Sequence, residues 1–413
     1  MIIKRGMLKK IYRALILFLF FFDISFIGIP SLISTRKIVF VFLVFYAFRN
    51  KLRVVPDNLK KWKVLFVSNI VILIYLFVIS SIMGVLGNSM SAIPNFIYFM
   101  IYTLLGALFL ANYFDNIYGF MEATIGAMWI QAIFVFVEFF SKAVRQAVSS
   151  IVIPTGNVDY VSSVRGNGLG AEAANLTLLL FLAVFCCNFI IINRGIRLKY
   201  IISQVVMLAA MILVGKTGLL VSFFFIAYTV MIVLPKTGKI IPAIKMTCIF
   251  SVLVILGVLI LKNIMTEADF YRQFYKFYYA ITDFSSNDSV NRFKEFLIPP
   301  LTAETMIGTG IIRGYTKSGL YLWNDSGYIQ MYSSIGLVFA IIFYSVLFRT
   351  IYKMIKDCVY SVDKEIINFM RMYLLTLMII EIKEPFVFKY VLPMFLLVII
   401  MLIQRSNNNE CTQ

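Results

Sequence analysis

The segment from Arg165 to Gly170 combines one arginine with three glycines, Gly166, Gly168 and Gly170, directly before a long apolar run. Glycines allow backbone N–H groups to converge, the start of a helix carries partial positive charge, and a guanidinium offers paired donors. This combination suits a phosphate or a pyrophosphate. A flexible loop end explains the same residues equally well when they are taken alone. Glu172 lies shortly after the glycines, where it could orient Arg165 or bind a substrate.

A second set of candidate residues lies between residues 288 and 328. Arg292 is expected on a short helix, Arg313 follows a Gly-x-Gly sequence, and Asp325 stands where a further apolar run begins. Ionisable residues at the edge of the hydrocarbon are functional candidates by default, but an aspartate in this position is also a common helix N-cap. Both interpretations of Asp325 are open at this point.

Two further cations, Lys216 and Arg272, are secondary candidates. Lys216 lies in a short turn between apolar runs, and Arg272 lies within residues 270–281, where apolar residues recur at helical spacing. We expect residues 270–281 to form an amphipathic helix on the membrane surface. Its tyrosines either stack on sugar rings or belong to an interfacial aromatic belt, which is the more common role.

These candidates must be positioned by helices in a membrane. The chain has 413 residues, of which 61% are apolar and 14% charged, and its mean hydropathy is +0.90. An average soluble chain is ~45–50% apolar, and one water-soluble core cannot bury such an excess. The net charge of +18 is scattered between apolar runs, so we expect no nucleic-acid partner. The absence of histidine excludes imidazole bases and His-ligated zinc. The five cysteines lack metal-binding spacing.

A run of about 20 apolar residues spans the hydrocarbon. This criterion predicts an all-α integral membrane protein, a single polytopic domain of residues 1–413 with about twelve spans. The predicted spans are residues 12–31, 32–48, 64–86, 96–114, 120–140, 171–193, 200–215, 217–234, 246–264, 326–348, 366–383 and 387–404. If the N-terminus is cytoplasmic, cytoplasmic segments hold 22 Lys and Arg and short outer loops hold 5, so both termini are expected inside. The long loops, residues 141–170 and 262–325, then lie outside and are expected to be functional.

Five carboxylates fall at membrane depth and share no spacing: Asp23, Glu122, Glu138, Glu172 and Glu381. Such residues can mark an ion or proton pathway. Glu122 and Glu381 lie near predicted span ends, where we expect their side chains to reach the interface at little cost.

The arrangement resembles the O-antigen polymerase family, integral-membrane glycosyltransferases of lipopolysaccharide biosynthesis in the bacterial inner membrane. Three stretches carry the resemblance: residues 165–172, residues 291–293 followed by Gly308-Thr309-Gly310, and Asp325-Ser326-Gly327-Tyr328. The related O-antigen ligases carry a catalytic histidine where this chain has Asp325, and relatives often have Ser and Arg in the turn that Lys216 occupies here. A ligase mechanism that depends on histidine is therefore disfavoured.

The resemblance implies a metal-independent, cofactor-free reaction on the periplasmic face. The donor would be an oligosaccharide on undecaprenyl diphosphate, the acceptor a sugar hydroxyl on another lipid-linked repeat, and a chain-length regulator protein a partner. Arginines can stabilise the diphosphate leaving group. We assign this role to Arg165, Arg292 and Arg313. Asp325, near the hydrocarbon, would accept from the acceptor hydroxyl. A flippase for the same lipid-linked glycan, or another polytopic transporter, is the alternative. A scaffold role in polysaccharide assembly is a third possibility.

Overall fold

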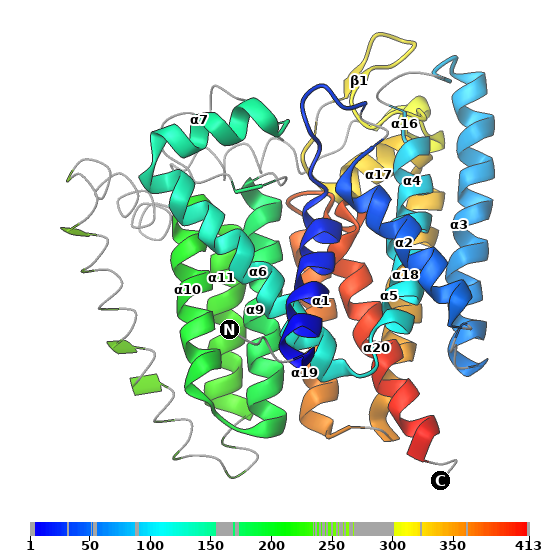
Figure 1. The fold of residues 1–413 in the computed structure, drawn as a ribbon. Helices are drawn as coiled ribbons and strands as arrows, with labels where there is room; N and C mark the ends of the chain where they lie inside the picture. The colour runs from blue at the N-terminus through cyan, green and yellow to red at the C-terminus, as the bar shows by residue number, and fades with distance from the viewer. Residues whose placement is uncertain are drawn as a thin grey trace. The chain divides into compact units, whose positions relative to one another are not determined.

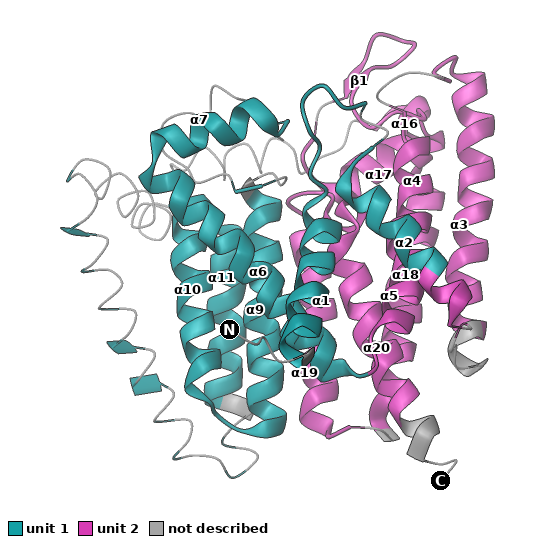
Figure 2. Cartoon of the chain, viewed as in Figure 1, with its two compact units in different colours: residues 1–45, 116–282 teal, residues 46–115, 283–413 magenta. Residues whose placement is uncertain are grey.

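The computed structural model describes most of the chain and is almost entirely helical. The described residues are 5–30, 33–50, 56–86, 91–153, 168–169, 173–233, 301–322, 324–360 and 362–410, with residue 52 and single residues or pairs between 235 and 267. The chain divides into two compact units (Figure 2). Unit 1 contains residues 1–45 and 116–282, and unit 2 contains residues 46–115 and 283–413. The boundary near residue 45 falls within α2 (Thr35–Arg49).

Unit 1 is a bundle of apolar helices built around α9 (Figure 1). Its described helices are α1 (Arg5–Phe22), α6 (Ile117–Phe140), α7 (Lys142–Ile151), α9 (Ala173–Arg194), α10 (Leu198–Val214), α11 (Thr217–Tyr228) and the π-helical turn η2 (Thr229–Val233). α9 packs against α6, α10 and α11, and nearly all of its side chains are buried. Because α9 is apolar on all sides, burial within the bundle is the expected outcome.

The first helix ends earlier than the sequence predicts. The predicted span 12–31 corresponds to α1, which begins at Arg5 and ends at Phe22. Buried Arg36 sets this end, because its guanidinium donates to the carbonyl oxygens of Phe20 and Phe21 over 2.9 and 3.0 Å. The same guanidinium pairs with Asp23 at 3.1 Å. Asp23 therefore takes part in a helix C-cap.

Unit 2 holds the remaining helices and one short hairpin. Its described elements are α3 (Pro56–Ile82), α4 (Ile93–Tyr98), the π-helix η1 (Phe99–Leu105), α5 (Gly106–Tyr113), α16 (Ala303–Ile307), β1 (Gly314–Tyr315), β2 (Tyr321–Leu322), α17 (Gly327–Ile335), α18 (Leu337–Asp357), η3 (Cys358–Tyr360), α19 (Lys364–Ile380), η4 (Phe386–Lys389) and α20 (Val391–Glu410). α18 packs on α3, and α20 packs on α5. The aromatic rings of Phe96, Phe343 and Phe388 meet in the core of this unit.

Several of these helices could cross a membrane. Among the described residues, five helices have the required length and apolar composition: Lys60–Ile82, Ile93–Tyr113, Ile117–Phe140, Ala174–Arg194 and Leu337–Asp357. Three shorter apolar helices, Leu198–Val214, Thr217–Met231 and Val391–Ser406, accompany them. The chain is thus an all-α protein with the helices of a membrane protein, as its composition predicts.

Candidate functional site

A short hairpin in unit 2 brings Arg313 and Asp325 together. β1 pairs with β2 in antiparallel register, Gly314 opposite Leu322, so the residues flanking the two strands lie close to each other. Arg313 precedes β1 and Asp325 follows β2, and Nη2 of Arg313 lies 3.1 Å from Oδ1 of Asp325. The Asp325 side chain is 60% exposed and that of Arg313 is 34% exposed. The pair therefore lies at the surface of unit 2 and is not buried within the protein.

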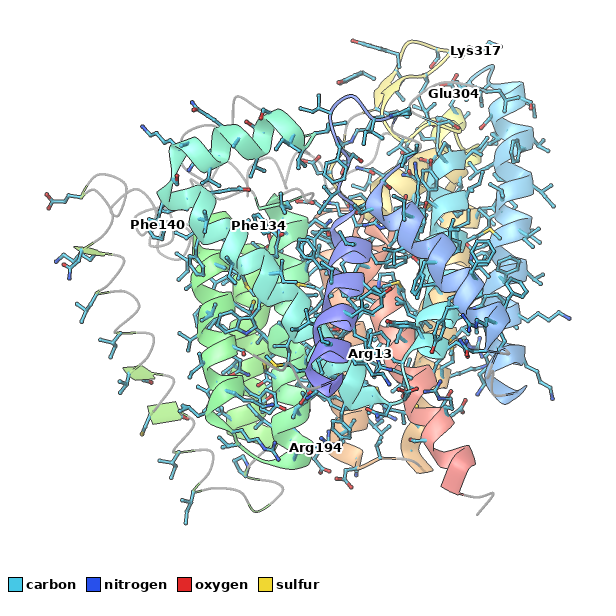
Figure 3. All side chains as sticks on the ribbon, viewed as in Figure 1. Arg13, Phe134, Phe140, Arg194, Glu304 and Lys317 are labelled. Atoms are coloured by element: carbon cyan, nitrogen blue, oxygen red, sulfur yellow. The ribbon has the colours of Figure 1, made fainter. Side chains whose placement is uncertain are left out.

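The same hairpin presents two tyrosines. The rings of Tyr315 and Tyr321 face each other across the strands with centroids 4.8 Å apart, and both side chains are exposed. Ser318 donates to Glu304 Oε2 over 2.7 Å and so connects the hairpin tip to α16. Figure 3 shows Glu304 and Lys317 at the same end of unit 2. Exposed aromatic rings on the same hairpin as Arg313 and Asp325 are suited to contact a sugar next to an anion that Arg313 binds.

The apolar run after Asp325 forms two helices that meet at Gly336. α17 ends at Ile335, and α18 begins at Leu337 and continues to Asp357. Gly336 adopts a φ of 79°, a left-handed conformation that glycine tolerates without a steric penalty. A Cβ at this position would also collide with the main-chain carbonyl of Ile307. The single predicted span 326–348 is therefore an interrupted helix.

The turn from Gly308 to Ile311 holds this interruption in place. Thr309 N donates to Ser333 O and Gly310 N donates to Ser334 O, each over 2.9 Å. These two carbonyls lie in the last turn of α17, where the break removes their helical partners. Main-chain donors from the turn replace those partners, which is how an irregular backbone is tolerated inside a membrane protein. The Gly308-Thr309-Gly310 sequence thus has a structural role, because its main chain binds the last turn of α17 at the break. We call the turn from Gly308 to Ile311 the clasp.

Buried Glu381 lies against the start of α17. Its Oε1 accepts a hydrogen bond from Tyr344 OH at 2.7 Å, and its Oε2 accepts from Val387 N at 2.8 Å. Its backbone carbonyl accepts from Gly327 N at 2.9 Å. A Cβ on Gly327 would collide with the Glu381 carboxylate. The expectation that Glu381 reaches the interface is wrong, because the chain folds the segment after α19 back over the side chain and leaves it 0% exposed.

A small cavity in unit 2 lies beside these elements. It is lined by Asn95, Gln330 and Ser334 together with apolar residues that include Ile312 and Phe388, and it has room for about one water molecule. Gln330 also donates to Asn324 O at 2.6 Å, next to Asp325 in the chain. Amides and a hydroxyl in a confined space can hydrogen-bond a water or a sugar hydroxyl.

In unit 1 the described part of the glycine-rich segment is held by α6. Gly168 N donates to Glu138 Oε2 at 2.9 Å, and the main chain of Leu169 exchanges two hydrogen bonds of 3.3 Å with the side-chain amide of Gln131. Glu138 and Gln131 are both buried. Because the N–H of Gly168 is directed at a carboxylate, Gly168 anchors the segment to the protein in this structure. The sequence offered no common spacing that links Glu138 to Gly168, since 30 residues separate them.

Lys216 lies in the turn between α10 and α11. The helix after it is held close to α9, because Gly218 N donates to Thr177 Oγ1 at 3.0 Å. Lys216 is half-buried and directly precedes the first residue of α11. This places Lys216 near the N-terminal turn of α9, which the glycine-rich segment precedes.

Glu122 has a structural role at the other end of α6. Its carboxylate pairs with Lys10 at 2.9 Å and with Lys199 at 3.5 Å, joining α1, α6 and α10. Six other candidates lie outside the described residues, as does the predicted amphipathic helix 270–281. The six are Arg165, Gly166, Gly170, Glu172, Arg272 and Arg292.

Within the described part of the chain, no three Cys, Asp or Glu side chains converge as metal ligands would. Comparisons of the chain with protein-family models, with curated proteins and with solved structures find no match. Two features that sequence reasoning missed are the break at Gly336 and the burial of Glu381. The glycine at position 336 was a visible signal for the first.

Proposed function

We propose that this chain is a polysaccharide polymerase of the O-antigen type, a membrane glycosyltransferase that joins oligosaccharides carried on undecaprenyl diphosphate. The observation that carries the proposal is the pairing of Arg313 with Asp325 at the start of α17. A cation for a diphosphate and an acceptor for a hydroxyl are held together there. The sequence resemblance around Asp325-Ser326-Gly327-Tyr328 supports the same assignment.

The reaction needs little from the protein beyond positioning and charge. The bond between the anomeric carbon of the donor sugar and the diphosphate oxygen breaks, and the electron pair leaves with the diphosphate. A hydroxyl oxygen of the acceptor sugar bonds to the anomeric carbon, and its proton passes to Asp325. Arg313 stabilises the negative charge that develops on the leaving diphosphate. Because diphosphate is already a competent leaving group, it needs no general acid. The remaining task is to orient the acceptor hydroxyl and take up its proton, which a carboxylate can do.

Substrate binding would itself free the carboxylate. In the structure Asp325 Oδ1 accepts from Arg313, and both side chains are partly exposed, so the pair contributes little to stability. A diphosphate carries more negative charge than one carboxylate and competes for the guanidinium. Asp325 would then turn toward the acceptor hydroxyl while Arg313 engages the donor. The exposed rings of Tyr315 and Tyr321 offer a surface for the sugars.

Other residues complete this proposal. Arg165 and Arg292 remain assigned to the diphosphate by the sequence, and Lys216 and Arg272 remain secondary candidates. We propose about twelve spans in the bacterial inner membrane, with both termini in the cytoplasm and the loops 141–170 and 262–325 in the periplasm. The distribution of Lys and Arg between short loops supports this orientation. A chain-length regulator is the proposed protein partner.

The interrupted helix favours one alternative, a flippase for the same lipid-linked glycan. Transporters commonly carry discontinuous helices at their substrate sites, and α17 and α18 form such an element. A flippase moves the lipid without changing a covalent bond, whereas a polymerase extends the glycan. The products in a cell therefore distinguish the two activities.

Two experiments test the proposal. In a deletion strain, lipopolysaccharide that carries one capped repeat indicates a polymerase, because repeats are still flipped. Loss of that single repeat as well indicates a flippase. In the direct test, purified protein in vesicles is mixed with a defined undecaprenyl-diphosphate-linked repeat, and chain length is read on a gel. A ladder of products is expected, and unchanged substrate would contradict the proposal.

A further inference from the structure

Helix α7 separates its residues into two faces. The helix follows α6 after the N-cap Ser141 and has the sequence Lys-Ala-Val-Arg-Gln-Ala-Val-Ser-Ser-Ile. At 3.6 residues per turn, its apolar residues occupy one uninterrupted arc of about 140° and its polar residues occupy the remainder. The apolar face consists of Ala143, Val144, Ala147, Val148 and Ile151. The polar face consists of Lys142, Arg145, Gln146, Ser149 and Ser150.

The protein covers the apolar face of α7 only in part. None of the ten residues of α7, all of them described, is buried. Val144 and Val148 are half-buried, whereas Ala143, Ala147 and Ile151 are exposed, Ile151 to 57%. A helix of ten residues is too short to be stable in water by itself. An amphipathic helix on a soluble protein normally buries its apolar side in the core. The exposed apolar face of α7 therefore needs another apolar partner.

Both ends of α7 are attached at the ends of apolar helices. At its start, the Arg145 side chain donates to Glu138 O in the last turn of α6, at 3.0 and 3.1 Å. At its end, Ile27 N donates to Ile151 O at 2.8 Å and Ile153 N donates to Ser25 O at 2.9 Å. Residues 25–27 follow α1, which packs against α6. Figure 1 shows α7 lying across the end of α6.

We infer that α7 is an interfacial helix whose apolar face lies in one leaflet of the lipid bilayer. The preceding helix α6 could span the membrane, and its last two turns expose the apolar residues Ile133, Val137 and Phe140. This exposed apolar surface of α6 ends where α7 begins. Figure 3 shows Phe140 pointing outward near the α6–α7 junction. The end of a membrane-spanning helix lies at the level of the lipid headgroups. A helix that starts at this end and runs across the axis of the spanning helix therefore lies in the interface.

Charge and neighbouring residues agree with a lipid occupant. Both charged residues of α7 are cations. Arg145 is bound to the end of α6, whereas Lys142 is exposed and complements anionic headgroups. The strand-like contact at the end of α7 adds the exposed apolar side chains of Ile27 and Ile153 beside Ile151. The main-chain pairing therefore brings three exposed isoleucines to the same end of α7. This inference does not rest on the proposed polymerase activity.

Single-cysteine spin labels test this placement in the full-length protein. The five native cysteines are replaced by alanine, and one cysteine is introduced by Val148→Cys or Ile151→Cys on the apolar face. Gln146→Cys and Ser149→Cys are the matched controls on the polar face. The labelled protein is reconstituted in vesicles of phosphatidylethanolamine and phosphatidylglycerol. Accessibility is measured to oxygen, which concentrates in hydrocarbon, and to a water-soluble nickel chelate.

We expect the oxygen-to-nickel accessibility ratio to be several-fold higher at positions 148 and 151 than at 146 and 149. Equal access of nickel to all four positions would overturn the inference, because the helix would then lie in water. Exclusion of both reagents from 148 and 151 would also overturn it, since protein would then cover the apolar face. If the cysteine-free protein does not fold, Ile151→Trp and Ser149→Trp in the native chain serve instead. The unmodified chain, with its three native tryptophans, gives the background quenching. Brominated lipid should then quench fluorescence beyond that background in Ile151→Trp but not in Ser149→Trp.

Discussion

Tyr344 donates a hydrogen bond of 2.7 Å to Oε1 of Glu381, and both side chains are buried. The second carboxylate oxygen accepts from the main chain of Val387. Buried carboxylates are expensive unless such partners satisfy them. The pair joins α18 to the end of α19 and also supports the start of α17, which follows Asp325.

Two replacements of Glu381 by residues of similar size should show how much its hydrogen bonds contribute to stability. Glu381→Leu leaves the Tyr344 hydroxyl and the Val387 N–H without an acceptor, at a cost of about 1–3 kcal/mol for each group. Glu381→Gln keeps an oxygen to accept from one of them and should lose less. Thermal unfolding of both variants in detergent measures the difference. Equal stability of the leucine variant and the unmodified protein would contradict this role.

Gly327→Ala should destabilise unit 2, because the added methyl group collides with the Glu381 carboxylate. Overpacking of this kind typically costs about 1–3 kcal/mol. Gly6→Ala is the control, since no atom lies near its Cβ position and alanine favours a helix. We expect a lower unfolding temperature for Gly327→Ala and an unchanged or slightly higher one for Gly6→Ala. A neutral result at position 327 would show that Glu381 moves away freely.

Gly336→Ala should weaken the clasp on the interrupted helix. The variant introduces strain at positive φ and also a collision with Ile307 O. Gly195→Ala shares the positive φ, 82°, but has no atom near its Cβ position, so it reports strain alone. The loss of thermal stability in Gly336→Ala beyond that in Gly195→Ala measures the cost of the collision with Ile307 O. Equal losses would mean that the contact with Ile307 contributes nothing.

Arg313→Ala should abolish polymer in the vesicle assay, because it removes the cation assigned to the leaving diphosphate. Asp325→Asn should reduce the rate at saturating donor by about 10²–10⁴-fold, the usual contribution of a positioned proton acceptor. Lys317→Ala is the matched control, a cation on the same hairpin that is not assigned to the reaction. We expect it to make polymer of normal length. Normal polymer from Arg313→Ala would remove Arg313 from the site.

Arg165→Ala and Arg292→Ala should also abolish polymer while the protein still inserts into the membrane. Both arginines are assigned to the diphosphate by sequence alone. Membrane fractionation measures insertion, and a gel of the lipid-linked products measures polymer length. Wild-type polymer from both variants would refute their assignment and leave Arg313 as the remaining cation of the proposed site.

The sequence by itself determined the class of protein, because hydropathy and charge are properties of composition and order. An apolar content of 61% with cations scattered between apolar runs is typical of a membrane protein, and five of the described helices have the length and composition to cross a membrane. The sequence also predicted Arg313 and Asp325 as candidate functional residues. Local signals of this kind need no knowledge of distant contacts.

Only the tertiary structure decided how distant residues meet. Arg313 meets Asp325 through a hairpin, Gly168 meets Glu138 across 30 residues, and the turn from Gly308 to Ile311 clasps the break at Gly336. Glu381 was misjudged because its position near the end of an apolar run suggests exposure, whereas the chain after α19 folds back and buries it. Hydropathy records how apolar a segment is, but burial and hydrogen bonding depend on which other segment packs against it.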